Sequence, residues 1–225
     1  VQKAGDIIPE VVEPLANLRN GLEKIFKMPT HCPECNTKLA KTKEEDAVWR
    51  CPNTKCPARV SSHIQHFASK GALDIEGLGE KNVYVLLENN IIDDIADIYA
   101  VSKEQLLPLE RFADLSAQNL IDTINEKRSP TLPRFLFGLG IRQVGTQTAV
   151  DLAQEFGSID KLATATVEEL QSVEGVGEVV AESIVAWFAD PENQIILNKF
   201  RQNNVWPIPA KKITGPLVGK SFVVT

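Results

Sequence analysis

The chain has 225 residues, of which 43% are hydrophobic and 24% charged, and its formal net charge is −6. No apolar run reaches the roughly 18 residues that a membrane helix needs, and the negative charge argues against a general nucleic-acid binder. The charge is unevenly distributed, because residues 27–70 hold eight basic and four acidic residues (+4), whereas residues 71–206 hold ten and 22 (−12). Binding of a polyanion by the acidic part must therefore depend on local geometry rather than on bulk charge.

The two ends of the chain suggest a piece of a larger protein. Val1 takes the place of an initiator methionine, and Ser221–Thr225 reads like a β-strand that is cut short. The first residues carry no signal-peptide pattern, so we expect a cytoplasmic protein.

All four cysteines lie in one block, which predicts a metal site. They form a C-x2-C pair and a C-x4-C pair with fifteen residues between them: Cys32, Cys35, Cys51 and Cys56. This spacing is typical of a zinc ribbon, in which two short knuckles complete one tetrahedron of thiolates. Two disulfides are the alternative, but they require an oxidising compartment. Four protein ligands leave no open coordination position, so we expect one structural zinc ion per chain.

Histidines and basic residues surround the cysteines. His31, His63 and His66 are expected to be solvated or packed, because four thiolates already complete the zinc shell. The basic residues form either a solvated face or a contact with phosphates: Lys38, Lys41, Lys43, Arg50, Lys55 and Arg59.

A helical repeat follows, and its clearest copy surrounds Gly175-Val-Gly177. Thr166 and Glu169 form a capping-box pattern at the start of the preceding helix, and an apolar-periodic segment closed by Pro191 follows the glycines. When the second small residue of each turn is aligned, four copies appear, with separations of 34, 32 and 32 residues: Gly79, Ala113, Gly145 and Gly177. A period near 32 predicts stacked helix–turn–helix units.

These turns predict phosphate binding. At a Gly-x-Gly corner, exposed N–H groups and the N-terminus of the second helix together favour an anion, and glycine permits its close approach. The candidate DNA-binding residues are Gly77, Gly79, Lys81, Arg111, Arg142, Gly145, Thr146, Gly175 and Gly177. The alternatives are tight turns without a ligand and ordinary surface side chains. Copy two has Arg111 and Ala113, and copy three has Gln143, in place of glycines; Glu80 and Glu178 count against phosphate binding in copies one and four.

The order of these features resembles that of bacterial NAD-dependent DNA ligases. Residues 1–11 are similar to the end of their oligonucleotide-binding barrel, Thr30-His-Cys-Pro33 to their zinc module, Leu139-Gly-Ile-Arg-Gln-Val-Gly145 to their helix-hairpin-helix units, and residues 215–225 to the first strand of their BRCT domain. The resemblance implies an enzyme that seals nicks by transferring AMP from NAD. The Lys-x-Asp-Gly motif that carries the adenylated lysine is missing from these 225 residues. We therefore expect a non-catalytic fragment, with NAD and magnesium used by the full-length enzyme and not bound here.

The predicted fold is mainly α, with short β remnants at both ends. The expected parts are the end of the barrel (1–26), the zinc finger (27–68), a four-unit helix-hairpin-helix domain (69–206) and the truncated start of the BRCT domain (207–225). The expected partner is nicked double-stranded DNA, bound as a monomer in the minor groove without sequence specificity. A helix-hairpin-helix module of another DNA-repair protein and an acidic protein-interaction scaffold remain as alternatives.

Overall fold

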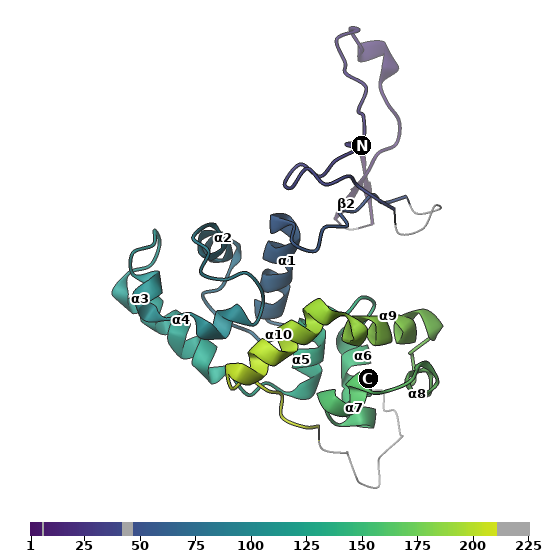
Figure 1. Cartoon of the computed structure of the whole chain (residues 1–225). Coiled ribbons are helices and arrows are strands. Elements are labelled where there is room, and N and C mark those ends of the chain that lie inside the picture. Colours follow the sequence, from purple (N-terminus) through teal and green to yellow (C-terminus); the bar gives the residue numbers. More distant parts are fainter. Residues whose placement is uncertain (6, 42–46, 211–225) are drawn as a thin grey trace. The chain divides into compact units, whose positions relative to one another are not determined.

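The computed structural model describes residues 1–5, 7–41 and 47–210 (Figure 1). Contacts divide the chain into two compact units, Val1–Pro52 and Asn53–Thr225. The predicted BRCT strand lies outside the described residues, and the predicted boundaries at 26, 68 and 206 stay predictions. In the described part of the chain, no helix combines the length and apolar character needed to cross a bilayer.

The first unit contains short β elements. Strands β1 (Gln2–Ala4) and β2 (Ile8–Glu10) pair antiparallel, and a single turn of 3-10 helix, η1, spans Ala16–Leu18. Two isolated antiparallel bridges follow, His31 with Lys38 and Ala40 with Arg50. The β hairpin is in keeping with the end of a barrel, which itself stays a prediction.

The second unit is helical, which confirms the mainly α prediction. Its elements are α1 (Pro57–Ala68), α2 (Glu80–Glu88), η2 (Asp97–Ala100), α3 (Lys103–Leu106), α4 (Asp114–Glu126), α5 (Leu132–Gly138), α6 (Thr146–Phe156), α7 (Ile159–Ala163), α8 (Val167–Gln171), α9 (Glu178–Ala189) and α10 (Pro191–Gln202). The four predicted repeats are the helix pairs α1–α2, α3–α4, α5–α6 and α8–α9. Helix α7 connects the third repeat to the fourth, and α10 follows the last.

An aromatic cluster joins the beginning, middle and end of this unit. The ring of Phe200 on α10 stacks on Phe67 of α1, with centroids 5.4 Å apart, and meets Phe135 of α5 edge-on at 5.1 Å. All three side chains are fully buried, so each contributes about 1.5–3 kcal/mol through burial. Figure 1 shows α10 running beside α5, and the cluster makes the repeats share one core.

Helix α1 packs closely on the end of α5. A Cβ atom at Gly138 would lie 3.0 Å from side-chain atoms of both Phe67 and Leu73, so a larger residue there would force these side chains to shift. The Nε2 atom of His63 donates to the carbonyl of Leu139 at 3.0 Å, and Nε2 of His66 donates to that of Phe137 at 2.7 Å. Both histidines are therefore packing residues, as predicted. Burial lowers the pKa of His63.

Some of the acidic side chains serve the fold. Asp94 and Asp97 accept hydrogen bonds from backbone N–H groups of the turn before η2, and Lys199 of α10 lies 2.6 and 2.8 Å from their carboxylates. Although burial alone would lower it, the pKa of Lys199 is raised by these two carboxylates. Part of the negative charge of residues 71–206 is thus neutralised inside the unit.

Candidate zinc centre and nucleic-acid interface

The four predicted zinc ligands come together in the structure. The Sγ atoms of Cys32, Cys35, Cys51 and Cys56 all lie within 4.8 Å of one another, and those of Cys35 and Cys51 are 3.4 Å apart. A tetrahedral shell with Zn–S bonds of about 2.3 Å requires sulfur separations of about 3.8 Å. A disulfide needs an S–S distance of about 2.05 Å, and none of the four cysteines forms one. The donor set and its spacing therefore fit one zinc ion, as predicted.

The first cysteine knuckle is a tight backbone turn. The N–H of Cys32 donates to the carbonyl of Thr37 at 2.8 Å, and Asn36 returns a bond to the carbonyl of Cys32 at 2.9 Å. Asn36 takes a positive φ of 56°, which asparagine tolerates better than most residues. The hydroxyl of Thr37 lies 3.2 Å from Sγ of Cys35, where it can donate to a thiolate.

The second knuckle leads directly into α1. Cys56 is the N-cap residue of this helix, and Pro57 is its first residue, where a missing N–H costs no helical hydrogen bond. The partial positive charge at a helix N-terminus stabilises a nearby thiolate. Asn53 forms the turn expected for the longer C-x4-C gap, since its side-chain oxygen accepts from the N–H of Lys55 at 3.0 Å.

The four predicted turns share one backbone geometry. In each copy, the N–H of a buried apolar residue donates to the carbonyl oxygen of the residue three positions earlier, at 3.0–3.4 Å. The four donors are Leu78, Phe112, Val144 and Val176. The next residue is the N-cap of the second helix in all four. The second copy, which the sequence left in doubt, is therefore a hairpin like the others.

The first hairpin position requires a left-handed backbone. Gly77 and Gly175 have φ values of +87° and +79°, and the non-glycine residues Arg111 and Gln143 take +77° and +67° at the equivalent positions. The first glycine thus serves the turn itself, and copies two and three accept backbone strain there.

The second hairpin position has no such requirement. Gly79, Gly145 and Gly177 have φ values between −83° and −84°, and a Cβ atom built on any of them would meet no atom within 4 Å. Ala113 occupies this position in the second copy without strain. Neither φ nor packing in the described chain requires glycine at these three positions, although glycine is a common N-cap residue.

Three of the hairpin helices lack a side-chain cap that some other helices of the unit have, although α1 and α5 also begin without one. Ser158, Thr166 and Asp190 cap α7, α8 and α10 with side-chain oxygens, whereas α2, α6 and α9 have no side-chain cap. Helix geometry leaves the first N–H groups without intrahelical acceptors, so these three hairpins present donors to solvent. In the second copy, the Oγ atom of Ser116 accepts from the N–H of Ala113 at 2.9 Å.

A side-chain bridge connects the first two hairpins. Nε of Arg111 donates to Oδ1 of Asn82 at 3.2 Å, and Nδ2 of Asn82 donates to the carbonyl of Gly77 at 2.7 Å. A hollow of about 360 Å³ opens beside the bridge, lined by Gly79, Glu80, Lys81, Asn82 and Arg111. The two cations of this hollow thus lie beside the uncapped N-terminus of α2.

The third and fourth hairpins are connected too. The hydroxyl of Ser183 on α9 donates to the carbonyl of Arg142 at 2.9 Å. One side-chain hydrogen bond thus joins the first hairpin to the second, and another joins the third to the fourth. Asn82 and Ser183, which make the two connections, were missed, because a polar residue in the first or second turn of a helix carries no signal of its own.

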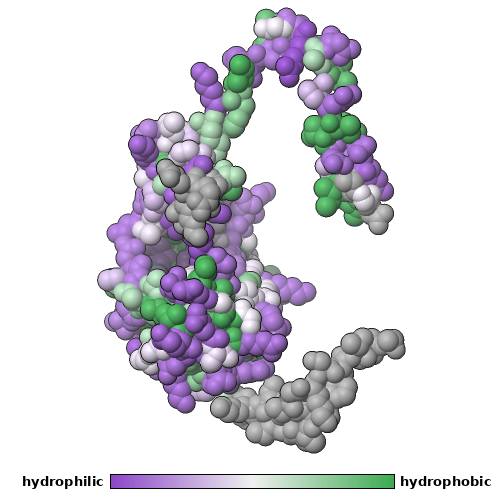
Figure 2. Space-filling view, turned by 90° about the vertical axis from the view of Figure 1, so that its right-hand side faces the viewer, coloured by the Kyte–Doolittle hydropathy of each residue, from purple (hydrophilic) through white to green (hydrophobic). Residues whose placement is uncertain are grey.

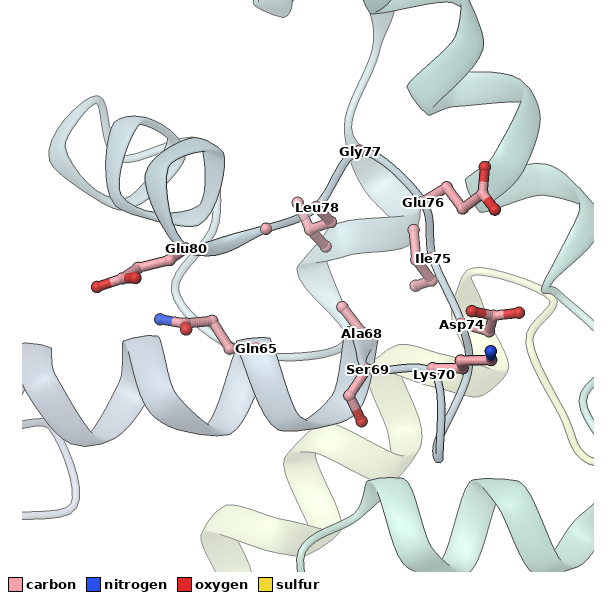
Figure 3. A pocket seen from close by; sticks show the side chains of 11 residues that line it. Gln65, Ala68, Ser69, Lys70, Asp74, Ile75, Glu76, Gly77, Leu78 and Glu80 are labelled. Carbon is pink, nitrogen blue, oxygen red and sulfur yellow. The ribbon is translucent and has the colours of Figure 1, made fainter. Parts of the chain in front are cut away.

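A second hollow lies on the other side of the first hairpin (Figure 3). It has a volume of about 360 Å³ and runs from the end of α1 to the start of α2. Figure 3 shows Gly77 at the bend, with the side chains of Glu76 and Glu80 pointing in opposite directions away from it. The Glu80 carboxylate therefore does not cover the bend.

All nine residues predicted to bind DNA are exposed: Gly77, Gly79, Lys81, Arg111, Arg142, Gly145, Thr146, Gly175 and Gly177. Exposure of these corners is a precondition of the predicted role. Their contact with DNA stays a prediction.

Comparisons with known proteins agree with both parts of the site. Residues 31–58 match the family model of the NAD-dependent DNA ligase C4 zinc finger domain, and residues 134–197, which contain the third and fourth hairpins, match that of the helix-hairpin-helix motif. The chain is 44% identical to the DNA ligase of Rubrobacter xylanophilus over 100% of its own length and 33% of the relative's. It is also 44% identical to that of Solibacter usitatus (100% and 34%) and 45% identical to that of Bacillus cereus strain AH187 (91% and 30%).

The chain spans about a third of the length of these curated relatives. The zinc-finger match is specific to one group of enzymes, and the alignments to relatives extend along the entire chain. The chain therefore belongs to the NAD-dependent DNA ligase family.

Proposed function

We propose that this chain is the part of an NAD-dependent DNA ligase that holds nicked duplex DNA, while the adenylation chemistry belongs to another part of the enzyme. The whole enzyme would join nicks in bacterial DNA replication and repair, in the cytoplasm. The relatives are named DNA ligases, and the Lys-x-Asp-Gly motif of the reactive lysine is missing from the chain. NAD and magnesium would accordingly act elsewhere in the enzyme.

The observation that carries this proposal is the open corner at the second hairpin position, where three of the four copies have glycine. At Gly79, Gly145 and Gly177 neither φ nor packing calls for glycine, and each precedes a helix without a side-chain cap. A phosphate that accepts from the exposed N–H groups would come close to the N-cap Cα, where a side chain would obstruct it.

Such contacts read no sequence. Phosphate oxygens are the same at every nucleotide, so backbone N–H donors fix the position of the duplex without distinguishing bases. Lys81, Arg111 and Arg142 lie on or beside the hairpins and can supply charge there. This arrangement explains how a unit with a net charge of −12 over residues 71–206 can bind a polyanion.

The two pairs of hydrogen-bonded hairpins, one with two and three with four, suggest how the duplex is held. If each pair contacts both strands across the minor groove, then two pairs would follow the duplex for about one helical turn. The second hairpin would contribute chiefly through Arg111, because Ser116 already occupies the N–H of Ala113.

The zinc ion, when bound, would act as a four-thiolate cross-link between the two knuckles and supply no chemistry to a reaction. Cys32, Cys35, Cys51 and Cys56 would hold it.

Binding of a fluorescent nicked duplex at increasing salt tests the proposal. We expect affinity that is independent of sequence and falls steeply as salt rises from about 50 to 200 mM. Leucine at positions 79, 145 and 177 together should abolish binding, and a monomer should persist in sedimentation. If the wild-type chain has no DNA affinity at low salt, the proposal is wrong, and the interaction-scaffold alternative gains.

A further inference from the structure

One position of the hairpin repeat is not explained by phosphate binding. The second residue of the helix after each hairpin is Lys81, Leu115, Gln147 or Val179, at the same spacing as the N-caps. Polar and aliphatic residues alternate, so the first and third hairpins carry a long polar side chain and the second and fourth an aliphatic one.

The two aliphatic side chains lie in solvent. Leu115 is 72% exposed and Val179 is 56% exposed, whereas the apolar residue inside every hairpin is buried. The repeat therefore has a fixed place for its core residue, and Leu115 and Val179 are additional to it. Figure 2 faces the side on which α8 and α9 lie in Figure 1 and shows apolar patches among hydrophilic surface, whereas α4, which carries Leu115, lies on the other side in Figure 1.

The place of these side chains in the helix suggests what they contact. Each stands two residues after an N-cap, Ala113 or Gly177. At Gly177 the first N–H groups of the helix face the proposed phosphate, and in the second hairpin the phosphate contact would come from Arg111. In duplex DNA every phosphate is joined to deoxyriboses, whose C–H edges form the apolar walls of the minor groove. An aliphatic side chain beside a bound phosphate would meet one of these walls.

We propose that Leu115 and Val179 pack on deoxyribose in the minor groove, while Lys81 and Gln147 make polar contacts with the backbone from the equivalent positions. This inference rests on the proposed function and adds a second kind of contact to it. Removal of aliphatic surface from water contributes affinity that does not depend on counterion release.

The pairing of the hairpins supports the assignment. Arg111 and Asn82 join hairpins one and two, and Ser183 and Arg142 join hairpins three and four. Each pair of joined hairpins thus presents one polar and one aliphatic side chain, so the two pairs would contact DNA in the same way. The acidic neighbour of Leu115, Asp114, is offset by Lys103 at 2.8 Å.

The test measures DNA affinity and its salt dependence separately. The double variant Leu115→Ala with Val179→Ala, in the full chain, is titrated against a fluorescent nicked duplex between about 50 and 200 mM salt. We expect affinity about tenfold weaker than wild type at every salt concentration, with an unchanged slope of log affinity against log salt. The matched control Lys81→Ala should reduce the slope by about 0.9.

The outcomes separate this inference from the proposed function. If the DNA affinity of the wild type falls steeply with salt and the double variant binds DNA equally well, the proposed contact with deoxyribose is wrong, whereas the proposed binding of phosphates is unaffected. The inference is also wrong if the double variant keeps its affinity but shows a weaker dependence of that affinity on salt. Because both side chains are exposed, the variants should keep the wild-type melting temperature. The double variant Leu115→Gln with Val179→Gln repeats the test with long side chains that are polar instead of aliphatic. A wild-type chain without DNA affinity would overturn both proposals together.

Discussion

The guanidinium of Arg111 and the amide of Asn82 lie 3.2 Å apart, although 29 residues separate them in the sequence. Asn82 also holds the carbonyl of Gly77, so one amide contacts both hairpins of the first pair. This bridge explains why an arginine is accepted at a position with a φ of +77°. The side chain gains a fixed partner that a glycine could not have.

We predict that the bridge couples the stabilities of the two hairpins. Asn82→Ala and Arg111→Ala should each lower the free energy of unfolding by about 0.5–1.5 kcal/mol. The double variant should cost less than the sum, with a coupling of about 0.5 kcal/mol or more in urea denaturation. Asn82→Asp, which keeps the acceptor for Arg111, is the control. Strict additivity would show that the bridge contributes nothing to stability.

The two glycines of one hairpin should respond differently to alanine. Gly175→Ala places a Cβ at a φ of +79° and should cost about 1–2 kcal/mol of stability. Gly177→Ala places it in open space at a φ of −83°, and the entropy gain in the unfolded chain is opposed by the N-cap preference for glycine, so stability should change by less than about 0.5 kcal/mol while DNA affinity falls. Thermal unfolding and duplex titration of both variants check this. Loss of stability in Gly177→Ala would remove the main support for a phosphate at the corner.

Local signals made much of the fold predictable. The capping box at the start of α8 forms as the sequence indicated, with the N–H of Thr166 bonded to Glu169 at 2.9 Å and the N–H of Glu169 bonded to Thr166 at 3.2 Å. The cysteine spacing predicted the zinc site, and the hairpin period predicted the four repeats. Both predictions succeed because each knuckle and each hairpin is formed by a short stretch of consecutive residues.

What the sequence could not show depends on distant contacts. The aromatic cluster of Phe67, Phe135 and Phe200 unites helices that lie up to 133 residues apart in the sequence. Helix α9 ends at Ala189, just before Pro191 as expected, but Pro191 is also the first residue of α10, whose N-terminus is capped by Asp190 at 2.9 Å from the N–H of Glu192. A proline can mark the end of one helix or the start of the next, and only the chain after it decides.

Zinc should be present at one ion per chain, and its removal should act locally. A strong chelator is expected to unfold the knuckles, while most of the far-UV circular dichroism persists because the α-helices lie after Cys56. Cys51→Ser should weaken zinc retention, measured by metal analysis after dialysis. His31→Ala is the control, because His31 is exposed and its Nδ1 lies 3.0 Å from the hydroxyl of Thr30. Zinc loss in that control would mean that the ligand set is wrong.

An alanine at position 138 should be costly, because α5 approaches α1 closely there. A Cβ atom there would lie 3.0 Å from Phe67 and Leu73, both in the core. Gly138→Ala should therefore destabilise the chain by about 1–3 kcal/mol, seen as a lower urea midpoint with an unchanged slope. Gly79→Ala, where the added atom meets nothing within 4 Å, is the matched control. Equal midpoints for the two variants would contradict the packing seen here.

The last prediction concerns pH and follows from His63. Burial lowers the pKa of this imidazole, and a proton on it would also be opposed by His66 and Arg59, although the carbonyl of Leu139 and the carboxylate of Asp94 act the other way. In the unfolded chain its pKa returns to about 6.5, so below that pH the unfolded state binds a proton that the folded state does not. The contribution of His63 is therefore fully present above about pH 6.5 and is lost as the pH falls further towards the folded pKa. Unfolding free energies measured across this range should decline less steeply towards acid in His63→Gln, whose amide can still donate to Leu139 but does not titrate. Because both proteins keep the same cysteines, protonation of zinc ligands cancels in the comparison, and parallel pH profiles would show that His63 is not held neutral by the fold.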